Sequence, residues 1–198
     1  MIRLLLLAAL VAAPIAAAPL DEVAAALRAT TTMTADFTQT AGNGTVSTGK
    51  LTLARPGKIR FSYDKVPLLV VADGKRLVFV DYAVSQVSEW PIGSTPLGIL
   101  LNPDADLTRV AKVTGTANGA PQVTARDPKH PEYGVLSLAF SRDAAAPGGL
   151  ALTGWTATDA QNNVTEIRLL NTHYNGKVAA SSFSFRDPRV KQIPGKTF

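Results

Sequence analysis

The chain has 198 residues, enough for one domain with a sizeable core, and its 46% apolar and 18% charged residues are typical of globular proteins. Its formal charge of +5 favours anionic partners modestly, but no basic cluster interleaved with aromatic residues indicates nucleic-acid binding. The absence of cysteine excludes disulfides, thiolate metal sites, thiol nucleophiles and lipidation of the chain itself at cysteine.

The N-terminus has the pattern of a secretory signal peptide. Arg3 precedes an uncharged run over 4–18 that is rich in Leu and Ala. This run is shorter than the ~20 residues that a transmembrane helix needs. We therefore expect residues 1–18 to be removed on export and residues 19–198 to form the mature domain; the alternative is an uncleaved anchor.

A first helix is expected over 20–30, because Leu20, Val23 and Leu27 recur at helical spacing. A strand follows near Phe37, and a glycine-containing turn leads into the next strand. The narrow apolar face of the helix suits close packing on a sheet.

A hairpin over 49–64 turns at Arg-Pro-Gly, and apolar residues alternate with polar ones on both arms. Ile59 and Phe61 share one face of its second arm. Arg55 directly precedes Pro56, which restricts Arg55 to an extended backbone. From spacing alone, Arg55 is either a solvated turn residue or a functional group with a defined direction.

The next hairpin, over 68–82, is apolar on both faces. Leu77 and Phe79 lie on one face of its second strand, and Val78 and Val80 on the other. Antiparallel strands usually leave one face to water, so we expect a second cover. That cover is a helix, another sheet or a bound apolar ligand.

A short strand over 85–90 ends at Trp90, and a short helix follows over 97–101. Trp90 either packs in the core or lines the rim of a cavity. The helix is apolar nearly all round, so it cannot sit exposed. It either plugs the sheet or forms part of a lid; its apolar residues are Leu97, Ile99, Leu100 and Leu101.

The second half of the chain reads as successive strands, over 107–114, 122–126, 134–142, 150–158 and 164–174, with a last segment near 182–185. The total is about ten or eleven strands. A sheet of that size curls or closes. The predicted fold is mainly β: an incomplete antiparallel β-barrel with helices in its mouth.

Residues that could carry catalysis are scarce. His130 and His173 lie far apart in the sequence, and both are expected to be solvated. Neither belongs to a metal-binding spacing, and no nucleophile elbow is present. The sequence therefore predicts no enzyme, no catalytic or metal site and no cofactor; a secreted hydrolase is an alternative that no residue set supports.

The two hairpins together resemble the LolA family, the periplasmic carriers of outer-membrane lipoproteins. The matching motifs are G-x-L-x-L-x-R-P-x-x-x-R-F-x-Y and V-A-D-G-K-x-L-x-F-V-D-Y, followed by T-P-L-G-I-L-L. They occupy residues 49–63, 71–82 and 95–101, with weaker likeness at 35–40 and 175–185. Residues 103–165 match only in general β character.

The resemblance implies a half-barrel closed by a helical lid over an apolar cavity. It also implies a monomeric periplasmic chaperone that binds the acyl chains of lipoproteins and carries them to the outer membrane. Its partners would be acylated lipoproteins, an inner-membrane lipoprotein-releasing transporter and an outer-membrane lipoprotein acceptor, and not nucleic acid. The alternative is a periplasmic binder or sensor of another lipid or glycolipid on the same scaffold.

The resemblance also implies that Arg55 holds the empty lid closed, through hydrogen bonds to the backbone near Leu100 and Leu101. Ile59 stands where the family often has an aromatic residue, and Phe61 where a tryptophan is common, so the pocket would be reshaped. The expected ligand-binding set is Arg55, Ile59, Phe61, Leu77, Phe79, Trp90, Leu97, Leu100 and Leu101.

Overall fold

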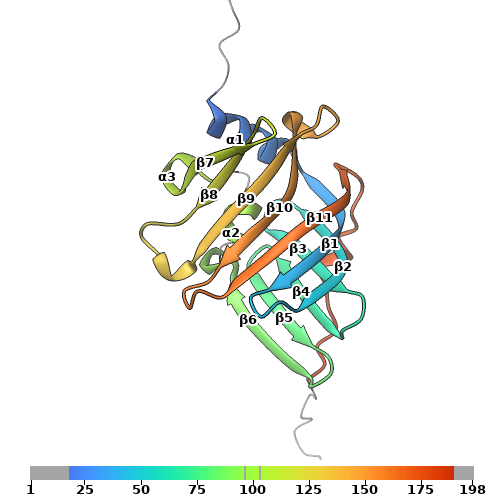
Figure 1. Ribbon diagram of the computed structural model, residues 1–198. Coiled ribbons are helices and arrows are strands. Elements are labelled where there is room, and N and C mark those ends of the chain that lie inside the picture. Colours follow the sequence, from blue (N-terminus) through green and yellow to red (C-terminus); the bar gives the residue numbers. More distant parts are fainter. Residues whose placement is uncertain (1–17, 96, 103, 190–198) are drawn as a thin grey trace, which may run out of the picture.

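A computed structural model describes residues 18–95, 97–102 and 104–189 (Figure 1). The expected signal peptide falls almost entirely on residues 1–17, outside the described residues. The strands are β1 Thr32–Ala41, β2 Val46–Ala54, β3 Lys58–Tyr63, β4 Leu68–Asp73, β5 Arg76–Asp81, β6 Gln86–Pro91, β7 Ala111–Ala117, β8 Ala120–Ala125, β9 Val135–Arg142, β10 Leu150–Thr158 and β11 Val164–Tyr174.

The eleven strands found in the described part of the chain form one antiparallel sheet in the order β6-β5-β4-β3-β2-β1-β11-β10-β9-β8-β7. Strands that follow one another in the chain pair in the sheet, except β6 and β7, and the pairing of β1 with β11 joins the two halves. Among the described residues, β6 and β7 form the two open edges. The predicted incomplete antiparallel barrel is confirmed.

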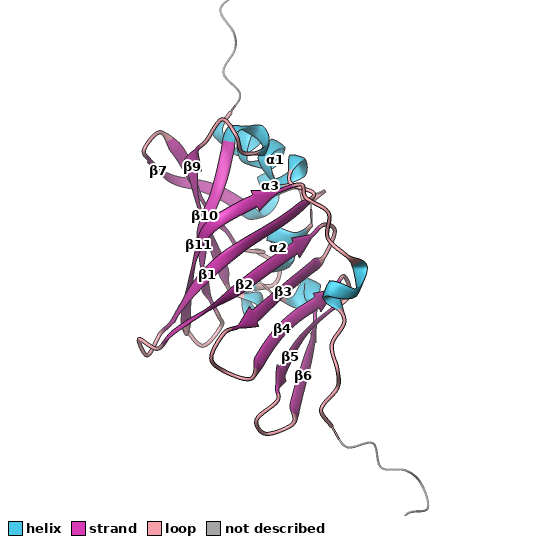
Figure 2. Cartoon of the chain, turned by 90° about the vertical axis from the view of Figure 1, so that its right-hand side faces the viewer, coloured by secondary structure: helices cyan, strands magenta, loops and turns pink. Residues whose placement is uncertain are grey.

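The helices lie on the concave side of this curled sheet, with α2 inside the curve and α1 across one end (Figure 1, Figure 2). Within the described residues, the α-helices are α1 Pro19–Ala29, α2 Leu97–Leu101 and α3 Leu107–Val110. The 3-10 turns are η1 Ile92–Ser94, η2 Pro131–Tyr133, η3 Pro147–Gly149 and η4 Ala180–Phe183. None of the described helices has the length and apolar character needed to cross a membrane.

The main core lies between the concave face and the helices. Alternate residues of β1 to β3, such as Phe37, Leu53 and Ile59, point into it and are buried. Leu27 of α1 and Leu100 of α2 belong to the same core cluster. The helices therefore cover the concave face rather than standing apart from it.

The C-terminal segment covers the convex face of β4 and β5. Phe183 of η4 is buried against Leu69, Val71, Val78 and Val80. Arg60 fastens this segment, since its Nη1 donates to the carbonyls of Ser182 at 3.2 Å and Ser184 at 3.0 Å. The second cover expected for these strands is therefore an irregular chain segment with one 3-10 turn.

Two sequence-based element predictions were wrong. Residues 107–110, expected to begin a strand, form α3, because Asp106 caps the helix by accepting from the Thr108 amide at 3.1 Å. The segment near 182–185 adds no strand, since its residues lie in η4 and in the irregular chain after it.

Candidate functional site

Arg55 lies at the end of β2 and reaches beneath two helices. Its Nε and Nη2 donate to the Leu100 carbonyl of α2 at 3.2 and 3.0 Å. Its Nη1 donates to the Thr30 carbonyl at 2.8 Å and to the Leu27 carbonyl, both at the end of α1. The alternative of a solvated turn arginine is therefore wrong.

The chemistry of a helix end explains these bonds. The last carbonyls of a helix lack partners within the helix and carry partial negative charge, which suits a guanidinium. Burial lowers the pKa of Arg55 from 12.5 to about 10, so the side chain remains charged at neutral pH. One charged side chain thus bridges the C-terminal ends of α1 and α2.

The turn after β2 adds a backbone contact that the sequence did not indicate. The Gly57 amide donates to the Leu101 carbonyl at 3.0 Å. Gly57 has a φ of 74°, and a Cβ there would lie 2.7 Å from the Gly74 Cα. Only glycine fits where these two turns come so close together. The Arg55 side chain and the Gly57 amide together hold the last two carbonyls of α2, those of Leu100 and Leu101.

Helix α2 is the plug of the half-barrel. Leu100 and Leu101 are buried in the main core, and Leu97 and Ile99 pack against it while partly exposed. Of the two roles predicted for this segment, the structure shows the plug. Opening of the helix as a lid remains a prediction.

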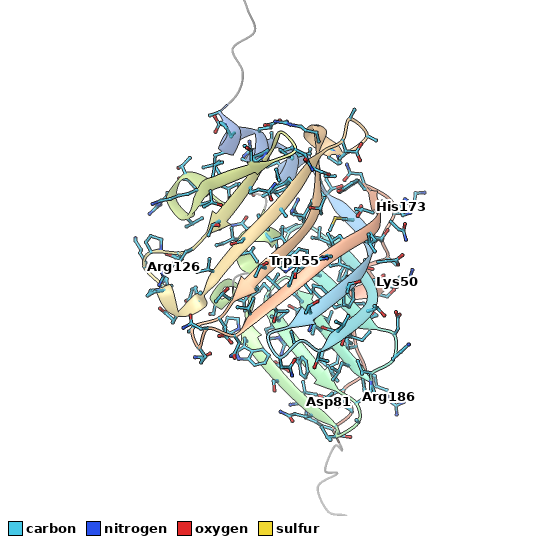
Figure 3. The ribbon with its side chains drawn as sticks, in the orientation of Figure 1. Lys50, Asp81, Arg126, Trp155, His173 and Arg186 are labelled. Atoms are coloured by element: carbon cyan, nitrogen blue, oxygen red, sulfur yellow. The ribbon has the colours of Figure 1, made fainter. Side chains whose placement is uncertain are left out.

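The interior beneath the helices is closely packed. Ile59 and Phe61 are buried on the concave face. Phe61 makes edge-to-face contacts with Phe37, at 5.3 Å between ring centroids, and with Trp155, at 6.1 Å. A cavity of only about 10 Å³ lies beside Arg55 under α1. Trp155 of β10 is itself buried in this interior (Figure 3).

The concave face of β5 and β6 is less well covered. Leu77 pairs with Trp90 across the two strands, so both side chains share one face with Phe79. Leu77 and Phe79 are partly buried, whereas Trp90 is 48% exposed. Core packing of Trp90 is therefore excluded, and its position fits the rim.

Tyr63 marks the polar border of the same face. It stacks edge-on against Phe37 with ring centroids 5.2 Å apart, and its hydroxyl donates to Gln39 Oε1 at 2.7 Å. Burial raises the pKa of Tyr63 to about 12. The phenol therefore remains a neutral donor at physiological pH.

A groove of about 560 Å³ borders α2 on the open side of the half-barrel; we call it the α2 groove. Ile92, Ile99 and Val110 line it, and so do the charged residues Arg109 and Asp127. It extends from the turns at Pro56 and Gly74 to the loop over 127–134. The α2 groove therefore lies beside the element that the lid hypothesis expects to move.

The two histidines lie away from this region. His130 is exposed and stacks on Tyr133 with ring centroids 4.6 Å apart, and His173 is exposed on the convex face (Figure 3). No group of three or more potential metal-ligating side chains occurs within the part of the chain that the structure describes.

The comparisons with known proteins agree with this architecture. The family model for the outer membrane lipoprotein carrier protein LolA matches residues 28–186. An outer-membrane lipoprotein carrier protein of Chromobacterium violaceum is 28% identical over 92% of this chain and 90% of its own length. One from Legionella pneumophila strain Paris is 31% identical over 82% of this chain and 83% of its own.

Among solved structures, a DUF1329 family protein from Desulfovibrio piger superposes with a TM-score of 0.50 at 11% identity, covering 84% of this chain and 97% of its own. That likeness supports the fold alone. With the family model spanning most of the described half-barrel, the chain belongs to the LolA family of outer membrane lipoprotein carrier proteins.

Proposed function

We propose that this protein is a periplasmic carrier that takes acylated lipoproteins from an inner-membrane releasing transporter to an outer-membrane acceptor, acting as a monomer. The acyl chains occupy the concave face once α2 has moved aside. The observation that carries this proposal is the way α2 is held. An apolar helix covers an apolar face, and the hydrogen bonds that hold its end go to the Arg55 side chain and the Gly57 amide and are not part of the pairing between strands.

The energetics suit a carrier. Each methylene group moved from water into the interior contributes about 0.8 kcal/mol, so long acyl chains bind strongly without specific contacts. A hydrogen bond from a charged donor contributes about 1.5–3 kcal/mol. The bonds from Arg55 to Leu100 therefore offset part of the gain on loading, and they re-form when cargo leaves.

The expected binding surface follows from the register. Ile59, Phe61, Leu77 and Phe79 lie on the concave face, with Trp90 at its exposed rim. Leu97, Leu100 and Leu101 are on the moving helix, and Arg55 is the latch. Leu100 and Leu101 of α2 pack against side chains of the strands in the main core, so departure of the helix would expose the strand residues that it now covers.

Photo-cross-linking in cells tests the proposal. A benzophenone amino acid replaces Trp90, which is half exposed at the rim, or Lys50, which is exposed on the convex face (Figure 3). We expect Trp90 variants to cross-link acylated lipoproteins and Lys50 variants not to do so. Adducts at Trp90 that contain only glycolipid or free lipid would favour the alternative cargo, and equal lipoprotein adducts at both positions would contradict a concave binding face.

A further inference from the structure

The two open edges of the sheet are built differently. Strand β7 pairs with β8 through an irregular register, with a bulge between Val113 and Gly115, and it carries Lys112. Bulges and lysines are common devices that keep an edge strand from pairing with another chain. Strand β6 pairs with β5 through six consecutive residue pairs, from Gln86 to Pro91, without any shift. The β6 edge therefore retains the regular geometry that an added strand needs.

Apart from Pro91 at its end, which has no backbone N–H, β6 carries few of the residues that protect an edge strand. Glu89 is its only ionisable residue; Arg76 of the neighbouring strand donates to it at 2.6 Å, and Nη2 of Arg189 in the C-terminal segment lies 3.9 Å from it. Glu89 pairs with Val78, so its side chain lies on the convex face. Among the described residues, no strand pairs with the outer side of β6. Its outward backbone groups can therefore accept a partner strand.

The β6 edge is continuous with the mouth of the half-barrel. Its last residue, Pro91, leads directly into η1, and Ile92 and Gly93 of that turn line the α2 groove. Trp90 is half exposed on the concave face of the same strand end. A chain lying along β6 would therefore have one end at the lid and the other away from it (Figure 2).

We propose that β6 binds the polypeptide part of the cargo, as an added antiparallel strand. This inference rests on the proposed function, in which the acyl group lies under α2. An acylated N-terminal residue is then held at the Pro91 end of β6, and the following residues run outward toward Gln86. Because β6 itself runs from Gln86 to Pro91, the two chains are antiparallel.

Main-chain pairing suits a carrier of many different proteins. The hydrogen bonds of strand addition come from the peptide backbone, so they place few demands on the sequence of the cargo. Acyl burial supplies affinity, and the β6 edge orients the attached chain away from the lid. The edge thereby adds a contact to acylated polypeptides that a free fatty acid cannot make.

The first experiment uses three probes with the purified protein. One is an N-palmitoylated, fluorescently labelled ten-residue peptide of alternating Thr and Ala. The second is the same peptide N-methylated at every other amide, prepared in both registers, because an added strand uses alternate amides. The third is a fluorescent fatty acid without a peptide.

We expect N-methylation in one register to weaken binding about tenfold, while the fatty acid still binds. Equal affinities of all peptides, with fatty-acid binding intact, would overturn the β6 proposal and leave the proposed function standing. If the fatty acid does not bind at all, the protein does not bind acyl chains, and both proposals are contradicted.

Hydrogen exchange and proline variants locate the contact. The acylated peptide should slow exchange at alternate amides of β6 and leave β7 unchanged. Val87→Pro and Ser88→Pro alter neighbouring amides, of which one points toward β5 and one outward. In the variant that keeps the wild-type melting temperature, N-methylation of the peptide should no longer weaken binding. In Thr116→Pro on β7, N-methylation should still weaken binding as it does in the wild type. Slow exchange of all β6 amides in the free protein would overturn the proposal, because the edge would already be occupied.

Discussion

Arg55 connects more parts of the site than any other side chain that the structure describes. It donates four hydrogen bonds to three carbonyls, at Leu27 and Thr30 at the end of α1 and at Leu100 in α2. The bonds to α1 need not break when α2 moves. Arg55 can therefore stay bound to α1 while its bonds to Leu100 of α2 break and re-form.

Replacement of Arg55 by leucine should separate loading from release. Without the bonds to Leu100, the closed form loses about 1.5–3 kcal/mol relative to the open one, so acylated cargo should bind about ten- to hundredfold more tightly. Hand-over to the acceptor should fail, because release no longer restores these bonds. A two-step transfer assay with purified proteins measures both steps.

The matched control for that assay is Arg168→Leu. Arg168 pairs with Glu166 at 2.7 Å and is largely exposed. Its removal should change neither step. If Arg55→Leu hands over cargo as well as the wild type and Arg168→Leu, Arg55 is a structural anchor of α1 and not a latch.

The partly buried hydroxyl of Tyr63 makes the free energy of unfolding depend on pH. Its pKa is raised to about 12 in the folded protein, against an ordinary value of 10, so folding favours the neutral phenol. This contribution to stability is complete below pH 10 and is lost as pH rises toward 12. The free energy of unfolding of the wild type minus that of Tyr63→Phe should therefore fall between pH 9 and pH 11.5. Urea unfolding checks this, and a constant difference would show that Tyr63 ionises freely.

At this scale, the sequence predicted some contacts and missed others. The family resemblance placed the acceptors of Arg55 near Leu100, where one of them is found. The Gly57 contact was not predicted, because every residue carries a backbone amide and only the fold selects one. The bonds from Arg55 to the end of α1 were missed for a related reason, since helix carbonyls carry no sequence signal.

Helix α2 is the element on which the lid hypothesis depends. Its all-round apolar sequence predicted burial, and the structure buries it. The sequence did not separate plug from lid because burial satisfies both. Local stability separates them, since a lid opens without unfolding the sheet.

Two leucines allow that comparison. Leu100 of α2 and Leu136 of β9 are both 0% exposed. Leu136→Ala should lower the global free energy of unfolding by about 2–5 kcal/mol. Leu100→Ala should lower it less and instead speed hydrogen exchange in α2 alone. Equal global losses, without selective exchange in α2, would make α2 a permanent part of the core.

Elements in the second half were harder to predict. Residues 107–114 were expected to form a strand, but the Asp106 cap starts a helix first. The C-terminal segment has apolar residues at alternate positions, as strands do, yet it packs through Phe183 without joining the sheet. The local pattern of apolar residues predicts which side chains are buried, but it does not predict which strand, if any, the backbone pairs with.

On the scale of the whole molecule, the sequence predicted the approximate number of strands and the curvature of the sheet. It did not predict which strands join the two halves of the sheet. Successive hairpins account for nearly every neighbour in the sheet. The pairing of β1 with β11, which joins residues 124 (Ala41 and Thr165) to 141 (Met33 and Tyr174) positions apart, has no local signal. The open edges at β6 and β7 depend on that single long-range pairing, and so does the mouth between them.

Depletion of the protein in cells, followed by separation of the inner and outer membranes, tests the central claim most directly. Lipoproteins destined for the outer membrane are quantified in each fraction as the protein disappears. Carriage between the membranes predicts that they accumulate in the inner membrane and return to the outer membrane when the wild-type protein is restored, but not when Arg55→Leu is. An unchanged distribution of lipoproteins after complete depletion would contradict the claim.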